Sequence, residues 1–179
     1  MGPNGLPCAE DFFEAYDDVN YEGASNEDAG LGLIIGGSVN RDIREDGIFT
    51  CSLRVSCALN TSGLTIPSIG EQSTLIRGGS NDGTRALYDT ADLHAFLTTI
   101  TPPNATNQST ASTRRRLSTG QVAITIRPRL FTVDSDGNEE TTRSGHAGVV
   151  VDYSRNYRDG RIPTSENDIW ILETCPSDE

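Results

Sequence analysis

The chain has 179 residues, enough for one domain with a sizeable core, and 35% of them are hydrophobic. Its net charge is −12, its pI is about 4.5, and its 14 basic residues are all arginine. This acidic surface disfavours binding to nucleic acid and to anionic membranes. No apolar run reaches the roughly 18 residues of a transmembrane helix, and no signal peptide is visible at the N-terminus.

The N-terminal segment predicts a short helix followed by a strand. Residues 8–18 place Phe12 and Tyr16 one helical turn apart, so that both side chains share a face. Residues 31–39 form an apolar run broken by glycines, which favours a strand with a bulge.

The clearest pattern lies in residues 47–59. The odd positions from Phe49 to Leu59 are apolar, and the even positions from Thr50 to Ser56 are polar. Strict alternation of this kind is typical of a β-strand with one buried and one exposed face. We therefore expect a central strand here, around which the rest of the fold is organised.

The chain has four cysteines, and two of them lie in this central strand. Six residues of strand separate Cys51 from Cys57 by about 20 Å, too far for a disulfide. If all four are oxidised, Cys51 and Cys57 must therefore pair with Cys8 and Cys175 in one order or the other. The alternative is that Cys51 and Cys57 are reduced core residues.

The second half of the chain is rich in strand patterns. Residues 90–97 predict one or two helical turns with Thr90 as N-cap. Residues 100–120 have few large apolar side chains and predict an exposed polar arm within a single domain spanning residues 1–179. Alternating apolar residues around positions 122, 149 and 170 predict further strands. Together these patterns predict an all-β fold, an antiparallel sandwich or barrel-like domain with one or two short helices.

Two charged clusters are candidate binding sites. Asp134, Asp136 and Asn138 supply oxygen ligands at alternating positions, as the start of a calcium loop does, although the segment departs from the EF-hand pattern and also fits a hairpin turn. Calcium is the only cofactor that the sequence suggests. Arg114, Arg115 and Arg116 are the only concentrated positive charge, and we expect them to dock an acidic protein surface.

No catalytic motif stands out. His94 and His146 are the only histidines, and structural or exposed roles are favoured for both. A nucleophile elbow and a phosphate-binding loop are absent from the sequence. Asn60, Asn104 and Asn107 begin sequences that fit the N-glycosylation pattern.

These observations favour a non-enzymatic structural or interaction protein, a virion component that binds other protein subunits as a homo- or hetero-oligomer. Capsid, decoration, connector and tail proteins are the classes considered. A secreted or lumenal, disulfide-bonded glycoprotein domain is one alternative. A hydrolase whose site is assembled from distant residues is the other, and a cleft joining His146 or His94 to a Ser or Cys and a carboxylate would support it.

Overall fold

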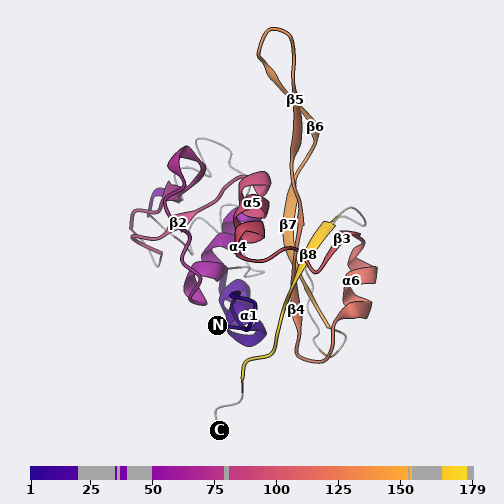
Figure 1. Cartoon of the computed structure of the whole chain (residues 1–179). Helices are drawn as coiled ribbons and strands as arrows, with labels where there is room; N and C mark the ends of the chain where they lie inside the picture. The colour runs from indigo at the N-terminus through magenta and orange to yellow at the C-terminus, as the bar shows by residue number, and fades with distance from the viewer. Residues whose placement is uncertain are drawn as a thin grey trace, which may run out of the picture.

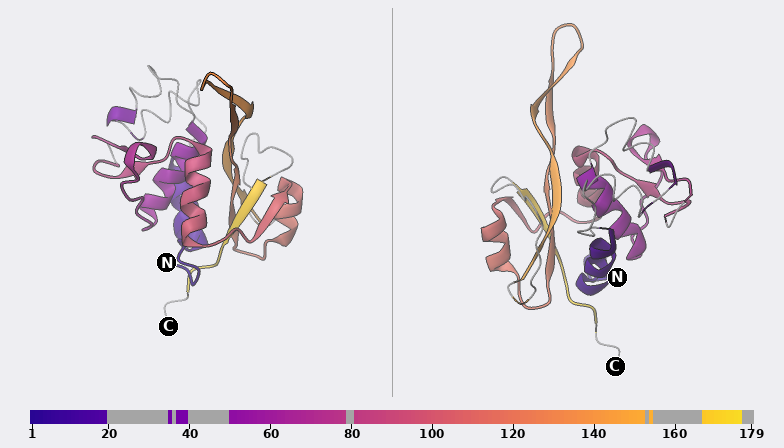
Figure 2. Two further views of the ribbon diagram at one scale, coloured as in Figure 1. Left: turned by 45° about the horizontal axis from the view of Figure 1, so that its top comes forward. Right: turned by 180° about the vertical axis from the view of Figure 1, so that it is seen from behind.

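The computed structural model describes residues 1–19, 35, 37–39, 50–78, 81–152, 154 and 167–176. It combines helices with a four-stranded antiparallel sheet and two small two-stranded sheets. Helices gather on both sides of the four-stranded sheet (Figures 1 and 2): α1 (Ala9–Val19), α4 (Thr50–Thr61) and α5 (Thr90–Ile100) on one side, and α6 (Thr110–Arg116) on the other. The predicted all-β sandwich or barrel is therefore wrong, because the fold is mixed α/β.

The four-stranded sheet has the order β3-β8-β4-β7, and its neighbouring strands are antiparallel. Ile124 pairs with Val149 of one neighbouring strand and with Trp170 of the other, and all three side chains belong to the main core between sheet and helices. The strands predicted around positions 122, 149 and 170 are thus confirmed. Their bounds are β3 (Ala105–Gln108), β4 (Val122–Arg127), β7 (His146–Val151) and β8 (Asn167–Leu172).

The predicted central strand is wrong, because residues 50–61 form helix α4. Residues 47–49 lie outside the described part of the chain. Six residues of helix rise by about 9 Å, so Cys51 and Cys57 are still too far apart for a disulfide, although not for the reason given by a strand.

The alternating sequence of α4 arises because the helix is buried on two sides. Val55 and Leu59 pack in the main core beneath the sheet. Leu53 and Cys57 pack in a second apolar cluster, whose other members include Ile76. Apolar residues are therefore needed on two sides, and the 3.6-residue period of a helix with one buried face is hidden.

The predicted helix over residues 8–18 is confirmed as α1, in which the rings of Phe12 and Tyr16 stack with centroids 6.1 Å apart. The predicted strand over residues 31–39 is not found in the described residues of that run, Ile35 and 37–39, which are helical. Among the described residues, no helix has the length and apolar character needed to cross a membrane.

The helical turns predicted at residues 90–97 are confirmed as α5, but its N-cap is Asp89 and not Thr90. The Asp89 side chain accepts a hydrogen bond from the backbone N–H of Ala91 at 2.7 Å. The hydroxyl of Thr90 instead accepts from the backbone N–H of Arg129 at 3.0 Å, which ties the start of α5 to the segment after β4.

The predicted exposed arm over residues 100–120 contains β3 and α6 and is part of the folded body. Thr113 of α6 is fully buried, and its hydroxyl donates to the carbonyl of Ser109. Small polar side chains can pack a short helix against a sheet. Such a helix lacks the large apolar residues by which an amphipathic helix is recognised in a sequence. The segment therefore lacks a visible hydrophobic signal although it is ordered.

Strands β5 (Leu130–Val133) and β6 (Glu139–Arg143) form a hairpin that projects from the body of the molecule (Figures 1 and 2). Its apolar residues Leu130, Phe131 and Val133 are 46%, 45% and 59% exposed. A second small sheet pairs β1 (Thr74–Leu75) with β2 (Arg85–Ala86) and follows the short 3-10 helix η1 (Gly70–Gln72).

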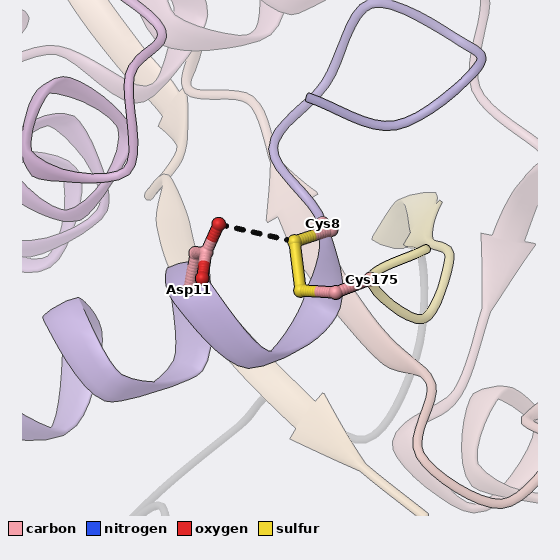
Figure 3. A group of neighbouring side chains, drawn as sticks. All are labelled: Cys8, Asp11 and Cys175. Carbon is pink, nitrogen blue, oxygen red and sulfur yellow. Dashed lines mark hydrogen bonds between the residues drawn. A yellow bond between two sulfur atoms is a disulfide. The ribbon is translucent and has the colours of Figure 1, made fainter. Parts of the chain in front are cut away.

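One disulfide joins the two ends of the described chain. Cys8 and Cys175 are bonded to each other across 167 residues, while Cys51 and Cys57 carry free thiols. The pairing of Cys8 and Cys175 with Cys51 and Cys57, expected if all four cysteines are oxidised, is therefore wrong, and the alternative of reduced Cys51 and Cys57 is confirmed. Asp11 lies beside the bridge, with a carboxylate oxygen 3.1 Å from the sulfur of Cys8 (Figure 3). Both sulfurs are used in the disulfide, so these three residues offer no thiolate to a metal while it is intact.

Candidate functional site

The two free thiols of α4 lie in different surroundings. Cys51 is the second residue of the helix, is half-buried, and contacts the edge of the main core. Cys57 is fully buried in the second cluster, and burial raises its pKa to about 12. A thiol must ionise and meet its substrate to act as a nucleophile, so Cys57 is inert and Cys51 is the candidate. The first turn of a helix also favours a negative charge, because its backbone N–H groups lack partners within the helix.

His146 is the first residue of β7 and is half-buried. The residue before it, Gly145, lies so close to α5 that a Cβ atom there would be 1.8 Å from the hydroxyl oxygen of Thr90. This tight passage fixes where β7 begins and therefore where the imidazole lies. The ring atom Nε2 is buried and has no hydrogen-bond partner among the described residues. A buried polar atom without a partner is costly and is typical of functional positions.

The charges around His146 keep its ring neutral. Its pKa is lowered, first by burial and then by the positive charges of Arg127 and Arg54. Arg127 is the direct cross-strand neighbour of His146, and Arg54 lies on α4, three residues after Cys51. A neutral imidazole can accept a proton, so His146 can serve as a general base near neutral pH.

Helix α4, which carries Cys51, packs against β7, an edge strand of the sheet that begins with His146. The influence of Arg54 on His146 places the first turns of α4 near the start of β7. Residues three apart in a helix are neighbours on its surface, so Cys51 lies beside Arg54. A thiol at a helix N-terminus next to a neutral imidazole is the arrangement used for nucleophilic catalysis by cysteine.

The other histidine, His94, is held in a structural pair. Its Nε2 lies 2.8 Å from a carboxylate oxygen of Asp168, and its ring meets Trp170 edge-on with centroids 5.2 Å apart. The indole N–H of Trp170 donates in turn to the carbonyl of Thr101 at 3.0 Å. These contacts fasten α5 to β8 and occupy the Nε2 atom of His94.

The remaining candidates lie on other elements and do not join this site. Arg114, Arg115 and Arg116 form the last turn of α6, where positive charge suits the helix dipole, and a guanidinium nitrogen of Arg114 donates to the carbonyl of Asp152 at 3.2 Å. Arg115 and Arg116 are exposed. Their docking of a protein surface stays a prediction.

The predicted calcium ligands lie in the turn of the β5–β6 hairpin. One carboxylate oxygen of Asp134 accepts from the backbone N–H groups of Asp136 and Asn138, each at 2.9 Å. The bonds from Asn138 are the main cause of the lowered pKa of Asp134. Asp134 therefore acts as a turn residue, and calcium binding by the three side chains stays a prediction.

Both Cys51 and His146 are named from the sequence, but they are not connected there. The alternating pattern predicts a strand and makes Cys51 a disulfide candidate, and His146 enters only in the hydrolase alternative, with an unspecified Ser or Cys. The signal that would have connected them is a thiol at the start of a buried helix, together with a histidine that follows a glycine at the start of a core strand. It is visible only once residues 50–61 are read as a helix.

The sequence matches no protein-family model and no curated protein. Solved structures do match. The type VI effector Tae4 from Enterobacter cloacae superimposes with a TM-score of 0.61 at 22% identity, over 93% of this chain and 97% of that one. The chain has the Tae4 fold.

Two effector–immunity complexes give the same result. Tae4 in the Tae4–Tai4 complex from Enterobacter cloacae matches with a TM-score of 0.60 at 22% identity, over 93% of this chain and 99% of that chain. The Tae4–Tai4 complex from Salmonella Typhimurium matches with a TM-score of 0.58 at 20% identity, over 95% and 99%.

The Tae4 fold corrects the function expected from sequence. The predicted non-enzymatic virion component, in a virion location, is wrong, because the structures that share this fold are bacterial type VI effectors. The expected class of viral structural proteins is wrong for the same reason. The expectation that the protein is not an enzyme is also overturned, since Tae4 effectors are enzymes.

Proposed function

We propose that the chain is a cysteine-dependent amidase that hydrolyses amide bonds in bacterial peptidoglycan. The observations that carry this proposal are a half-buried free thiol, Cys51, at the start of α4, and the imidazole of His146 at the start of β7, the strand on which α4 packs. The Nε2 atom of His146 is buried without a partner among the described residues, and its lowered pKa favours the neutral ring. Tae4 effectors, which share this fold, are peptidoglycan amidases. This likeness supports the proposal and suggests the substrate.

The proposed reaction has two steps. His146 takes the proton of Cys51, and the thiolate sulfur attacks the amide carbonyl carbon. The tetrahedral intermediate expels the amine, which receives the proton from His146, and a thioester with Cys51 remains. His146 then takes a proton from water, the hydroxide attacks the thioester, and the acid and the free thiol are released. The first turn of a helix favours negative charge, which suits the oxyanion formed in both steps.

The Cys8–Cys175 disulfide supports a location outside a reducing cytoplasm. Disulfides persist in oxidising compartments, of which the bacterial periplasm is one. Peptidoglycan is exposed to the same compartment. The disulfide and the proposed substrate therefore agree about where the protein acts.

The test is digestion of purified peptidoglycan, with release of new amino groups as the measurement. Cys51→Ala is expected to lower the rate at least about 10³-fold, because the nucleophile is lost. Cys57→Ala is the matched control, since it removes a thiol from the same helix and should retain the rate. Wild-type rates in Cys51→Ala would contradict the proposal.

We also propose a protein partner of the immunity type. The structures that share the fold include effectors in complex with Tai4, which supports a protein that binds and inhibits this chain. Arg114, Arg115 and Arg116 are candidate contacts, because they are the one basic cluster of a chain with a net charge of −12. The test is co-purification with candidate partners and loss of binding in the triple Ser variant at low salt, where charge contacts are strongest.

A further inference from the structure

The end of β4 carries an arginine whose contacts within the protein are incomplete. Arg127 is half-buried, and its Nε atom, like that of Arg129, is buried without a hydrogen-bond partner among the described residues. Two residues later, Arg129 is paired with Asp89 at 2.8 Å. The two neighbouring arginines therefore differ: the charge of Arg129 is neutralised by a carboxylate of the protein, whereas the described ion pairs give Arg127 no such partner.

Arg127 lies beside the proposed general base. It is directly opposite His146 in the antiparallel pair β4–β7, so both side chains point to the same face of the sheet. Directly opposite residues have Cβ atoms about 5 Å apart, within easy reach of a substrate held at His146. On the same face, two residues along β4, the hydroxyl oxygen of Thr125 is also buried without a partner among the described residues. Buried polar atoms left unsatisfied by the protein are the atoms that a polar ligand can satisfy.

The charge of this region fixes the kind of ligand. Two arginines, Arg127 and Arg54, act electrostatically on His146, and no carboxylate is among the charges that do so. In a protein of net charge −12 such a positive region is unusual. A guanidinium presents a planar set of donors that matches a carboxylate, often through two parallel hydrogen bonds.

We propose that Arg127 binds a carboxylate of the substrate, so that the enzyme acts on acidic peptides in which a free carboxylate flanks the scissile amide. The inference rests on the proposed amidase function and adds a specificity determinant to it. The carboxylate belongs to a residue next to the amide, because Arg127 adjoins His146 and an extended peptide advances only about 3.5 Å per residue. Arg127 selects the substrate, whereas Cys51 and His146 carry out the reaction.

The test uses three synthetic peptides that share one scissile amide. The first has a free carboxylate on the residue that donates the carbonyl, the second on the residue that donates the amine, and the third has carboxamides at both positions. Wild-type protein is expected to cleave one of the first two about 10- to 100-fold faster in kcat/KM than the third, the size expected for a hydrogen bond between charged groups. The peptide that is preferred shows on which side the carboxylate binds.

The Arg127→Met variant removes the charge and keeps most of the side-chain volume. It is expected to lose the 10- to 100-fold preference, because cleavage of the preferred peptide slows far more than cleavage of the carboxamide peptide. Arg127→Lys should recover part of the preference. Arg115→Met on α6 makes the same change of net charge at an exposed site and should keep the full preference. Equal loss on all three peptides, or no preference in the wild type, would overturn the inference.

Binding to the inactive Cys51→Ala variant separates this inference from the amidase proposal. Calorimetry is expected to show tighter binding of the preferred carboxylate peptide than of the carboxamide peptide, and Arg127→Met in the same background should remove the difference. If no peptide is cleaved but this difference persists, the amidase proposal fails and carboxylate recognition stands. If the peptides are cleaved in a Cys51-dependent way without any difference, carboxylate recognition fails alone.

Discussion

The α4–β7 region and the α5–β8 region each place one histidine between a helix and the sheet, with opposite outcomes. His94 of α5 is bonded to Asp168 and packed on Trp170, so its ring is fully engaged. His146 of β7 has a buried Nε2 without a partner in the described structure and two arginines as electrostatic neighbours. A histidine whose ring nitrogen is hydrogen-bonded within the protein stabilises the fold. A histidine whose buried nitrogen has no partner is the better candidate for a reactive site.

The largest expected contrast between the two regions is in catalysis. His146→Gln should lower the rate of peptidoglycan hydrolysis about 10³-fold, because glutamine cannot take the proton of Cys51. His94→Gln should stay within about threefold of wild type in kcat/KM, since His94 contacts no reacting group. Amine release measured on both variants tests this, and equal losses would remove the distinction between the two regions.

The two thiols of α4 should differ in their rate of alkylation nearly as much as the two histidine variants differ in activity. A pKa of about 12 leaves roughly one Cys57 thiol in 10⁴ ionised at pH 8, and its burial blocks the reagent as well. Brief treatment with iodoacetamide under native conditions should modify Cys51 about 100-fold faster than Cys57. Peptide mass spectrometry checks the ratio. Comparable labelling of both thiols would show that α4 does not separate a reactive side from a buried one.

The two histidines should rank in the opposite order in their contribution to stability. His94→Gln is expected to lower the free energy of unfolding by about 1–2 kcal/mol, because it removes a charge-assisted hydrogen bond and an aromatic contact that tie α5 to β8. His146→Gln should change it by less than about 0.5 kcal/mol, because no hydrogen bond of Nε2 is lost. Urea unfolding measures both values, and a larger loss in His146→Gln would contradict the structural role given to His94.

The smallest effect concerns pH. Burial and the charges of Arg127 and Arg54 lower the pKa of His146 below its ordinary value of 6.5, so the folded protein keeps the ring neutral at a pH where a free histidine is already half protonated. Activity should therefore persist as the pH falls to 6.5 and decline only below it. Arg127→Met should move the acid limb of kcat/KM upward, because one repulsive charge is removed. An acid limb above pH 6.5 in the wild type would contradict this assignment.

The strands of the main sheet could be predicted from sequence because their apolar residues recur at every second position or in a short run. In β4, Val122, Ile124 and Ile126 enter the main core, while the residues between them are small or polar although they are buried as well. Helix α4 could not be predicted, because Leu53 and Val55 are buried in different clusters and together imitate alternation. Alternation of apolar and polar residues therefore does not identify an element that packs against two separate apolar clusters, as α4 does.

The candidate site could be predicted only in its parts. Cys51 and His146 are visible in the sequence as a free cysteine and one of two histidines, but their proximity depends on the packing of α4 against β7. That contact joins residues 95 positions apart along the chain. No local sequence pattern records the contact between α4 and β7, because it depends on how α4 covers the edge of the sheet. Arg127 lacks a sequence signal for the same reason, since its significance comes from its cross-strand position opposite His146.

The Cys8–Cys175 bond makes the described chain a covalent ring closed through its two ends. A ring survives one cut without separating. A protease that nicks the projecting β5–β6 hairpin would therefore leave one molecule of unchanged mass apart from the added water, which falls into two fragments only on reduction. The same closure makes the protein suited to circular permutation, because new ends opened at the hairpin turn would replace old ends that are already side by side.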